Sequence, residues 1–149
     1  MSAFALRSPA FEDGAPIPRR HTCEGEDVSP ALEWIAPPAE ARSLAMVVED
    51  PDAPGGTFTH WLVWGIEPEA RGLAEGERPP LEGRNDFRWR GWRGPCPPRG
   101  HGPHRYVFRL VALDAMLKDL ARGAAARDVD EAVSGHVLAA AELTGTFER

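Results

Sequence analysis

The sequence predicts a mainly β domain, with a sheet-dominated core and one or two helices near the C-terminus. Short apolar runs suited to strands recur between turn signals. The 15 Pro and 15 Gly indicate many turns and fixed loops between short elements. Helical periodicity appears only late in the chain. No composition shift or internal repeat divides the 149 residues, so residues 1–149 are expected to form a single domain with its own core.

Three apolar runs are the predicted main strands, at residues 44–49, 60–66 and 106–113. The first two are apolar on both faces, as expected of strands inside a sheet that is covered on both sides. The third alternates at its start and is then apolar throughout. A last strand is expected around residues 146–148.

Helix is predicted after residue 127. Asp128 can act as the N-cap, with Glu131 three residues on, in an acidic version of the capping box. Apolar residues then recur at helical spacing at Val129, Ala132, Val133, Val137 and Ala140. A shorter helix is expected over residues 116–120.

The stretch from residue 67 to residue 105 has almost no periodic apolar pattern. Loops this long inside a domain are usually functional or disordered. Trp89 and Trp92 argue against disorder, because indoles seldom stay exposed without a reason. The stretch is therefore predicted to be an ordered loop packed on the sheet.

The net charge of −6 and pI near 5.4 give no reason to expect nucleic-acid binding. Seven arginines are nevertheless concentrated in one stretch, opposed there only by Asp86: Arg84, Arg88, Arg90, Arg93, Arg99, Arg105 and Arg109. They could steer a small anion toward a site. The alternative is that they are solvated side chains lying over apolar neighbours.

The N-terminal segment lacks a basic region and a sustained apolar run, so no signal peptide is predicted and the protein is expected to be cytoplasmic. No basic amphipathic helix is evident, and stable membrane association is not expected. In a reducing cytoplasm Cys23 and Cys96 are expected to be free thiols. A disulfide between them is the alternative, because separation in sequence says nothing about distance in the fold.

Three polar positions mark the candidate site. Asp50 follows the first predicted strand, His60 opens the second and His104 lies at the mouth of the third. A carboxylate beside an imidazole fixes the ring's tautomer and raises its pKa, and two imidazoles offer N–H donors to an oxyanion. The Pro- and Gly-rich loop of residues 94–103 suits a small preformed pocket.

Each of these features also has a structural interpretation. An Asp-Pro-Asp sequence is commonly a turn, and a histidine at a strand end is commonly just a satisfied polar residue. Cys96, His101 and His104 match no standard zinc spacing and lack a fourth ligand. Neither a metal nor a cofactor is expected.

The Asp50-Pro-Asp-Ala-Pro motif, the His60-Trp61 pair and the Gly-Pro-x-Pro-Pro-x-Gly run ending in His-Arg-Tyr resemble the two signature regions of the phosphatidylethanolamine-binding protein family. Residues 17–30 and 135–147 extend the resemblance over nearly the whole chain, to the prokaryotic Raf kinase inhibitor-like branch. The resemblance implies a large central antiparallel sheet flanked by a smaller one. It also implies a pocket for phosphate, acetate or a phosphoryl headgroup.

The resemblance assigns the ligand-binding positions to Asp50, Asp52, His60, Gly94, Cys96, Pro97, Pro98, His104 and Tyr106. Cys96 stands where eukaryotic members often have Gly, which would place a thiol on the rim of the pocket. Because an ionised Asp50 would repel a fully ionised phosphate, the ligand is expected to keep one proton. Its affinity should therefore fall as the pH rises.

Three classes of function remain. The favoured class is a binding module for a phosphorylated small molecule, headgroup or protein segment. The second is a regulator that presents its loop to a kinase or peptidase as a protein partner. The third is a hydrolase or isomerase that uses Asp–His pairs as acid and base, but it lacks an evident nucleophile unless Cys96 supplies one. Tryptophans exposed in the long loop could form a dimer interface, so a homodimer is also possible.

Overall fold

The computed structural model describes residues 3–149. Met1 and Ser2, which begin the segment considered above for a signal peptide, lie outside that range. The elements follow the chain in the order β1 (Ala5–Arg7), a 3-10 turn (Arg19–His21), β2 (Leu32–Ile35), β3 (Ser43–Asp50), β4 (Phe58–Ile66), β5 (Gly72–Leu73), β6 (His104–Leu113), α1 (Ala126–Val133) and β7 (Val137–Phe147).

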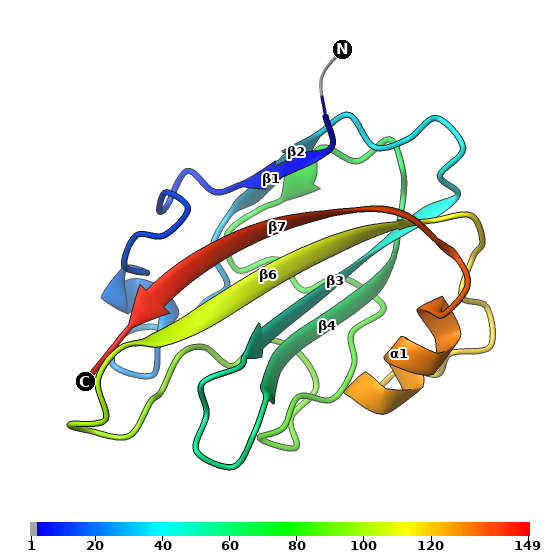
Figure 1. The fold of residues 1–149 in the computed structure, drawn as a ribbon. Coiled ribbons are helices and arrows are strands. Elements are labelled where there is room, and N and C mark those ends of the chain that lie inside the picture. The colour runs from blue at the N-terminus through cyan, green and yellow to red at the C-terminus, as the bar shows by residue number, and fades with distance from the viewer. Residues whose placement is uncertain (1–2) are drawn as a thin grey trace.

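Two antiparallel sheets form the framework (Figure 1). The larger sheet has the strand order β4-β3-β6-β7, and the smaller sheet has the order β1-β2-β5. The prediction of a mainly β fold, with a large antiparallel sheet and a smaller one beside it, is confirmed. The three predicted main strands correspond to β3, β4 and β6.

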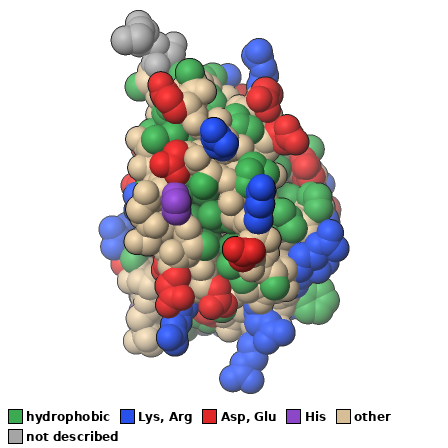
Figure 2. Space-filling model, turned by 90° about the vertical axis from the view of Figure 1, so that its right-hand side faces the viewer, with side chains coloured by type: hydrophobic (Ala, Val, Ile, Leu, Met, Phe, Trp, Pro, Cys, Tyr) green, Lys and Arg blue, Asp and Glu red, His purple; other side chains and the backbone are tan. Residues whose placement is uncertain are grey.

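Strands β3 and β4 of the large sheet are buried on both faces, which explains why they read as continuous apolar runs. Alternate side chains of β3, β4 and β6 pack toward the small sheet, among them Leu44, Met46, Val48, Trp61, Val63, Phe108 and Leu110. The intervening side chains form a second cluster with α1, which includes Ala45, Leu62, Trp64, Val111 and Val129. On the α1 side of the molecule, acidic and basic side chains are interleaved around hydrophobic ones (Figure 2).

The C-terminal helix is shorter than predicted and begins earlier. Its N-cap is Ala125, and Asp128 lies at the third helical position, where its carboxylate accepts a hydrogen bond from the Ala125 N–H at 3.0 Å. The helix ends at Val133. Val137 and Ala140 belong to β7, where Val137 pairs with Leu113 of β6. The helical spacing of these residues was misleading because pairing with β6 determines their conformation.

One other local prediction was wrong. Residues 116–120 form a turn at 118–119 within irregular structure instead of a short helix. In the long loop, Trp92 is buried and packs near Trp61, with ring centroids 5.5 Å apart. Trp89 is 49% exposed, and the Arg93 guanidinium lies 4.9 Å from its ring centroid. Of the two indoles in the loop, Trp92 therefore packs in the core and Trp89 does not.

Candidate functional site

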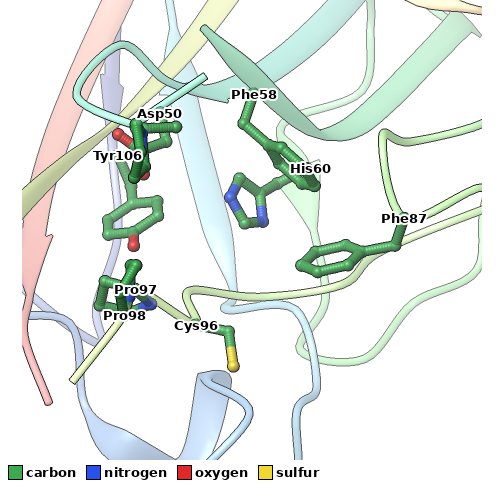
Figure 3. Close-up of a pocket in the computed structure, with 10 residues that line it drawn as sticks. Asp50, Phe58, His60, Phe87, Cys96, Pro97, Pro98 and Tyr106 are labelled. Carbon is green, nitrogen blue, oxygen red and sulfur yellow. The ribbon is translucent and has the colours of Figure 1, made fainter. Parts of the chain in front are cut away.

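The strand ends bring the candidate residues together. The end of β3 and the beginnings of β4 and β6 lie at the same end of the large sheet (Figure 1). A cavity of about 170 Å³ opens there, lined by Asp50, Ala53, Pro54, Phe58, His60, Phe87, Cys96, Pro97, Pro98 and Tyr106 (Figure 3). Six of the nine positions predicted from the sequence therefore line one cavity.

A β-bulge in β4 places His60. Val48 pairs with Trp61 and Glu49 pairs with Thr59, so His60 is an extra residue on the β4 side of the ladder. A bulge of this kind can re-aim a side chain at the edge of a site. The His60 ring consequently lines the cavity although Trp61, next in sequence, packs in the core.

Asp50 is held from two sides. One carboxylate oxygen, Oδ1, accepts the N–H of Asp52 at 2.7 Å, and the other lies 2.6 Å from Nδ1 of His104. Asp50 is 3% exposed and His104 is 2% exposed. This buried pair gives the carboxylate a fixed orientation at the cavity.

His104 does not line the cavity, but it contacts Asp50, which does. Its second ring nitrogen, Nε2, lies 2.6 Å from Nδ1 of His101. The His101 side chain is exposed. The sequence prediction considered His101 only as a metal ligand. The His-x-x-His spacing across Gly102-Pro103 was the signal for this contact.

His60 uses one ring nitrogen inside the protein. Its Nδ1 lies 2.6 Å from the carbonyl oxygen of Arg93, which can only accept, so Nδ1 carries the proton. Burial lowers the pKa of His60 and favours the neutral ring, in which Nε2 is an acceptor. The expectation that both imidazoles would offer N–H donors to an oxyanion is therefore wrong. His60 donates to Arg93, and both nitrogens of His104 are engaged elsewhere.

Tyr106 is the donor that the cavity retains. Its ring is 1% exposed, and its hydroxyl has no hydrogen-bond partner among residues 3–149. Burial, followed by the charge of Asp50, raises the pKa of Tyr106. The hydroxyl therefore stays protonated at physiological pH and is available as a donor.

Aromatic side chains form one wall of the cavity. The Phe58 and His60 rings lie with centroids 5.1 Å apart, and the Phe58 and Phe87 rings lie 4.7 Å apart, edge to face. The sequence prediction missed both phenylalanines. Phe87 belongs to the long loop, where no periodicity indicated which side chains face the site.

Two other predicted positions have structural contacts instead. Asp52 accepts hydrogen bonds from the Arg105 side chain and from the Arg105 N–H, which lower the pKa of Asp52 to about 2. The N–H of Gly94 donates to Oδ1 of Asp27 at 2.8 Å, and a Cβ at this position would collide with the carbonyl oxygen of His21. Neither residue lines the cavity.

The two cysteines form a disulfide, which corrects the expectation of free thiols. The Cα atoms of Cys23 and Cys96 lie 5.4 Å apart, within the range that a disulfide spans. The turn after Arg19–His21 lies beside the pocket loop, and the Cys23 N–H donates to the Pro95 carbonyl at 3.1 Å. Cys96 thus contributes a disulfide sulfur to the cavity lining, and the expected thiol on the rim is absent from this form of the protein.

No positive charge comes from the ten described residues that line the cavity. Four of the seven clustered arginines have partners elsewhere. Arg93 lies over Trp89, Arg99 pairs with Glu24, Arg105 pairs with Asp52, and Arg109 lies 4.0 Å from Glu142. Within residues 3–149, no group of three or more His, Cys, Asp or Glu side chains is arranged to hold a metal ion. The cavity is thus acidic and aromatic.

A family model described as phosphatidylethanolamine-binding protein matches residues 7–148. The UPF0098 protein of Methanothermobacter thermautotrophicus is 48% identical over 97% of this chain and 98% of its own length. A lipoprotein-named relative, LppC of Mycobacterium tuberculosis, is 42% identical over 97% of this chain and 72% of its own length.

Solved structures agree with this similarity. A phosphatidylethanolamine-binding protein homolog from Chlamydia trachomatis superimposes with a TM-score of 0.94 at 40% identity, covering 100% of this chain and 99% of that one. E. coli YbcL gives a TM-score of 0.92 at 31% identity, covering 99% of each chain. In the part of the chain that the structure describes, no helix has the length and hydropathy needed to cross a membrane.

Proposed function

Because this chain belongs to the phosphatidylethanolamine-binding protein family, in its prokaryotic branch, we propose that it is a binding protein for small phosphoryl-bearing ligands that carry one proton. The ligand could be a phosphorylated small molecule, a headgroup or a phosphorylated segment of a partner. The observation that carries this proposal is the set of three unequal polar groups around one cavity: the Asp50 carboxylate, Nε2 of His60 and the Tyr106 hydroxyl.

Two of these groups accept hydrogen bonds and one donates. A hydrogen phosphate ester or ion matches this set, because its P–OH can donate to Asp50 or His60 while a phosphoryl oxygen accepts from Tyr106. A fully ionised phosphate has no proton to donate and would meet the negative charge of Asp50 with no cation in the described lining. The predicted ligand is therefore the monoanion.

The geometry supports the binding class over the hydrolytic one. Cys96, the residue that could have supplied a nucleophile, has no thiolate while it is bonded to Cys23. Asp50 and His104 form an Asp–His pair, but the histidine nitrogen that would act on a substrate faces His101.

Calorimetry with inorganic phosphate and with sulfate tests the proposal. The two ions have similar size and shape, but only phosphate retains a proton near neutral pH. We expect phosphate to bind at pH 6 and to bind on the order of tenfold more weakly at pH 8, because the monoanion is depleted above a second pKa near 6–7. Sulfate should not bind. Equal binding of the two ions, or binding of ethanolamine without phosphate, would contradict the proposal.

The cytoplasmic location remains a prediction, and the disulfide is an observation against it, because most cytosolic thiols are kept reduced. Alkylation of free thiols in intact cells, followed by mass spectrometry, distinguishes the two cases. Modified Cys23 and Cys96 would support a reducing compartment, and unmodified cysteines that react only after reduction would refute it.

A further inference from the structure

A hydrogen-bonded chain runs from the cavity to the protein surface. Asp50 lines the cavity, its Oδ2 lies 2.6 Å from Nδ1 of the buried His104, and Nε2 of His104 lies 2.6 Å from Nδ1 of the exposed His101. The two histidine rings meet with centroids 4.9 Å apart and planes at 65°. No other polar atom is needed to connect the carboxylate with solvent.

The backbone around His101 is arranged for this contact. Gly100 and Gly102 adopt positive φ angles of 75° and 86°, which favour glycine, and the ring of Pro103 fixes its own φ. The His101 N–H donates to the Pro98 carbonyl at 3.2 Å, and the Gly100 N–H donates to the Arg149 carbonyl at 3.0 Å. The exposed ring is therefore held against His104 by its own turn.

We propose that His101 is a positioning residue of the cavity: it forms the solvent end of a chain through which Asp50 and His104 take up a proton when a phosphoryl ligand binds. The inference deepens the proposed function and rests on it for the identity of the ligand. The proposed connection between His101 and Asp50 does not depend on the ligand.

The charge of the chain depends on how many protons it holds. With Asp50 ionised and both rings neutral, the chain has a charge of −1 and repels an anion. Nε2 of His101 can take one proton from solvent. The added positive charge can then be shared by the two rings, because the proton between Nδ1 of His101 and Nε2 of His104 can lie on either nitrogen. The chain then has no net charge, and its carboxylate end still accepts a ligand P–OH.

Other ionisable groups face this chain. Asp52 and Arg105 form an ion pair beside His104, with the charges opposed at 2.9 Å. Tyr106 and His60 line the cavity together with Asp50, and Tyr106 remains protonated while His60 remains neutral near pH 7. Arg149 donates from Nε to the Pro97 carbonyl and faces Tyr106. Burial lowers the pKa of His60, and its Nδ1 is bonded to Arg93 instead of to the chain, so its change of charge at lower pH is separate from the chain.

The test follows the histidine ring signals by NMR as the pH is changed. His136 is an internal control, because it pairs with Asp114 at 2.8 Å on the exposed surface and is not part of the chain. In the ligand-free protein, Asp50→Asn should change the pH dependence of the His101 ring signals, since a negative charge is removed from the other end of the chain. The His136 curve should not move.

Inorganic phosphate provides the second arm, and it should move the wild-type His101 curve to higher pH. If phosphate does not bind, the ligand-free comparison still decides whether the chain couples Asp50 to the surface. A His101 curve that is unchanged in Asp50→Asn would overturn the inference even if phosphate binds normally. His101→Gln keeps a side-chain donor for His104 but cannot titrate. At pH 6, where phosphate itself is mostly the monoanion, it should reduce the proton uptake on phosphate binding, measured by calorimetry in buffers with different ionisation enthalpies, and uptake equal to that of the wild type would also overturn the inference.

Discussion

His60 and Tyr106 face each other in the cavity with ring centroids 5.3 Å apart and planes at 76°. The two side chains come from different strands, and each has a polar atom that the protein does not use: Nε2 in the neutral His60 ring and the hydroxyl of Tyr106. A buried polar atom without a partner, such as the Tyr106 hydroxyl, destabilises the free protein. Its position in the lining of the cavity, together with His60, favours a ligand that completes the site.

Tyr106→Phe separates binding from folding. The substitution removes a hydroxyl that has no partner among the described residues, so the free energy of unfolding should stay the same or increase slightly. Phosphate affinity should fall about 2- to 13-fold, which corresponds to the loss of roughly 0.5–1.5 kcal/mol for one hydrogen bond. Urea unfolding and calorimetry on the same preparation measure the two effects. An unchanged affinity would mean that Tyr106 does not touch the ligand.

Asn85 supports the aromatic wall from below. It is 2% exposed, its Oδ1 accepts the N–H groups of Phe87 and Trp89, and its Nδ2 donates to the Gly91 carbonyl. Asn85→Ala should cost about 1–3 kcal/mol of unfolding free energy, because these backbone groups lose their partner. It should also weaken phosphate binding by displacing Phe87.

Phe87→Ala is the matched control for this prediction. Because Phe87 is 42% exposed, its removal should have a smaller effect on stability than Asn85→Ala while still opening the cavity. Chemical denaturation ranks the two variants. A larger loss of stability in Phe87→Ala would contradict the assigned role of Asn85.

The disulfide joins segments that are 73 residues apart in sequence. Cys23→Ser should lower the free energy of unfolding by about 2–4 kcal/mol, because a long loop is no longer closed in the unfolded chain. The cavity should persist, since the hydrogen bonds from the Cys23 N–H to Pro95 and from the Gly94 N–H to Asp27 remain. Dithiothreitol should destabilise the wild type by a similar amount and leave Cys23→Ser unaffected. Equal unfolding midpoints with and without the reductant would show that the bond is not formed.

The buried His60 predicts how stability depends on pH. Its pKa is lowered by burial, so below the ordinary histidine value near 6.5 the unfolded chain binds a proton more readily than the folded one. The corresponding contribution to stability is present above that value and is lost as the pH falls through the pKa of the folded state. His60→Gln should flatten the profile of unfolding free energy below pH 6.5, measured by urea titration. A wild-type profile that is already flat there would exclude this effect.

Much of the fold and part of the site could be predicted from the sequence, for identifiable reasons. Strands such as residues 44–49 and 60–66 are apolar on both faces, which predicts that both faces are covered. The pattern did not give the strand order, because β3 is central in the large sheet whereas β4 lies at its edge. Residues 137–147 were harder, because β7 is an edge strand containing small residues, and Val137 and Leu138 remain exposed. Its helical spacing was accidental, and the pairing partner that decides its conformation is distant in sequence.

The site shows the same division. Asp50 and His104 could be assigned from their motifs. The bulge at His60 depends on the register between β3 and β4, which cannot be read from the sequence of either strand alone. The Cys23–Cys96 bond depends on how a distant turn packs against the pocket loop. Both features arise from tertiary contacts, and single-strand periodicity carries no information on them.

The most direct test of the proposed phosphoryl site is an NMR titration of the isotope-labelled protein with inorganic phosphate at pH 6. Saturable shifts are expected at Asp50, His60 and Tyr106, with smaller shifts at exposed arginines such as Arg88 and Arg90. Shifts confined to the arginines, without saturation and with the cavity residues unmoved, would show that phosphate only contacts the basic surface and would contradict the proposed phosphoryl site.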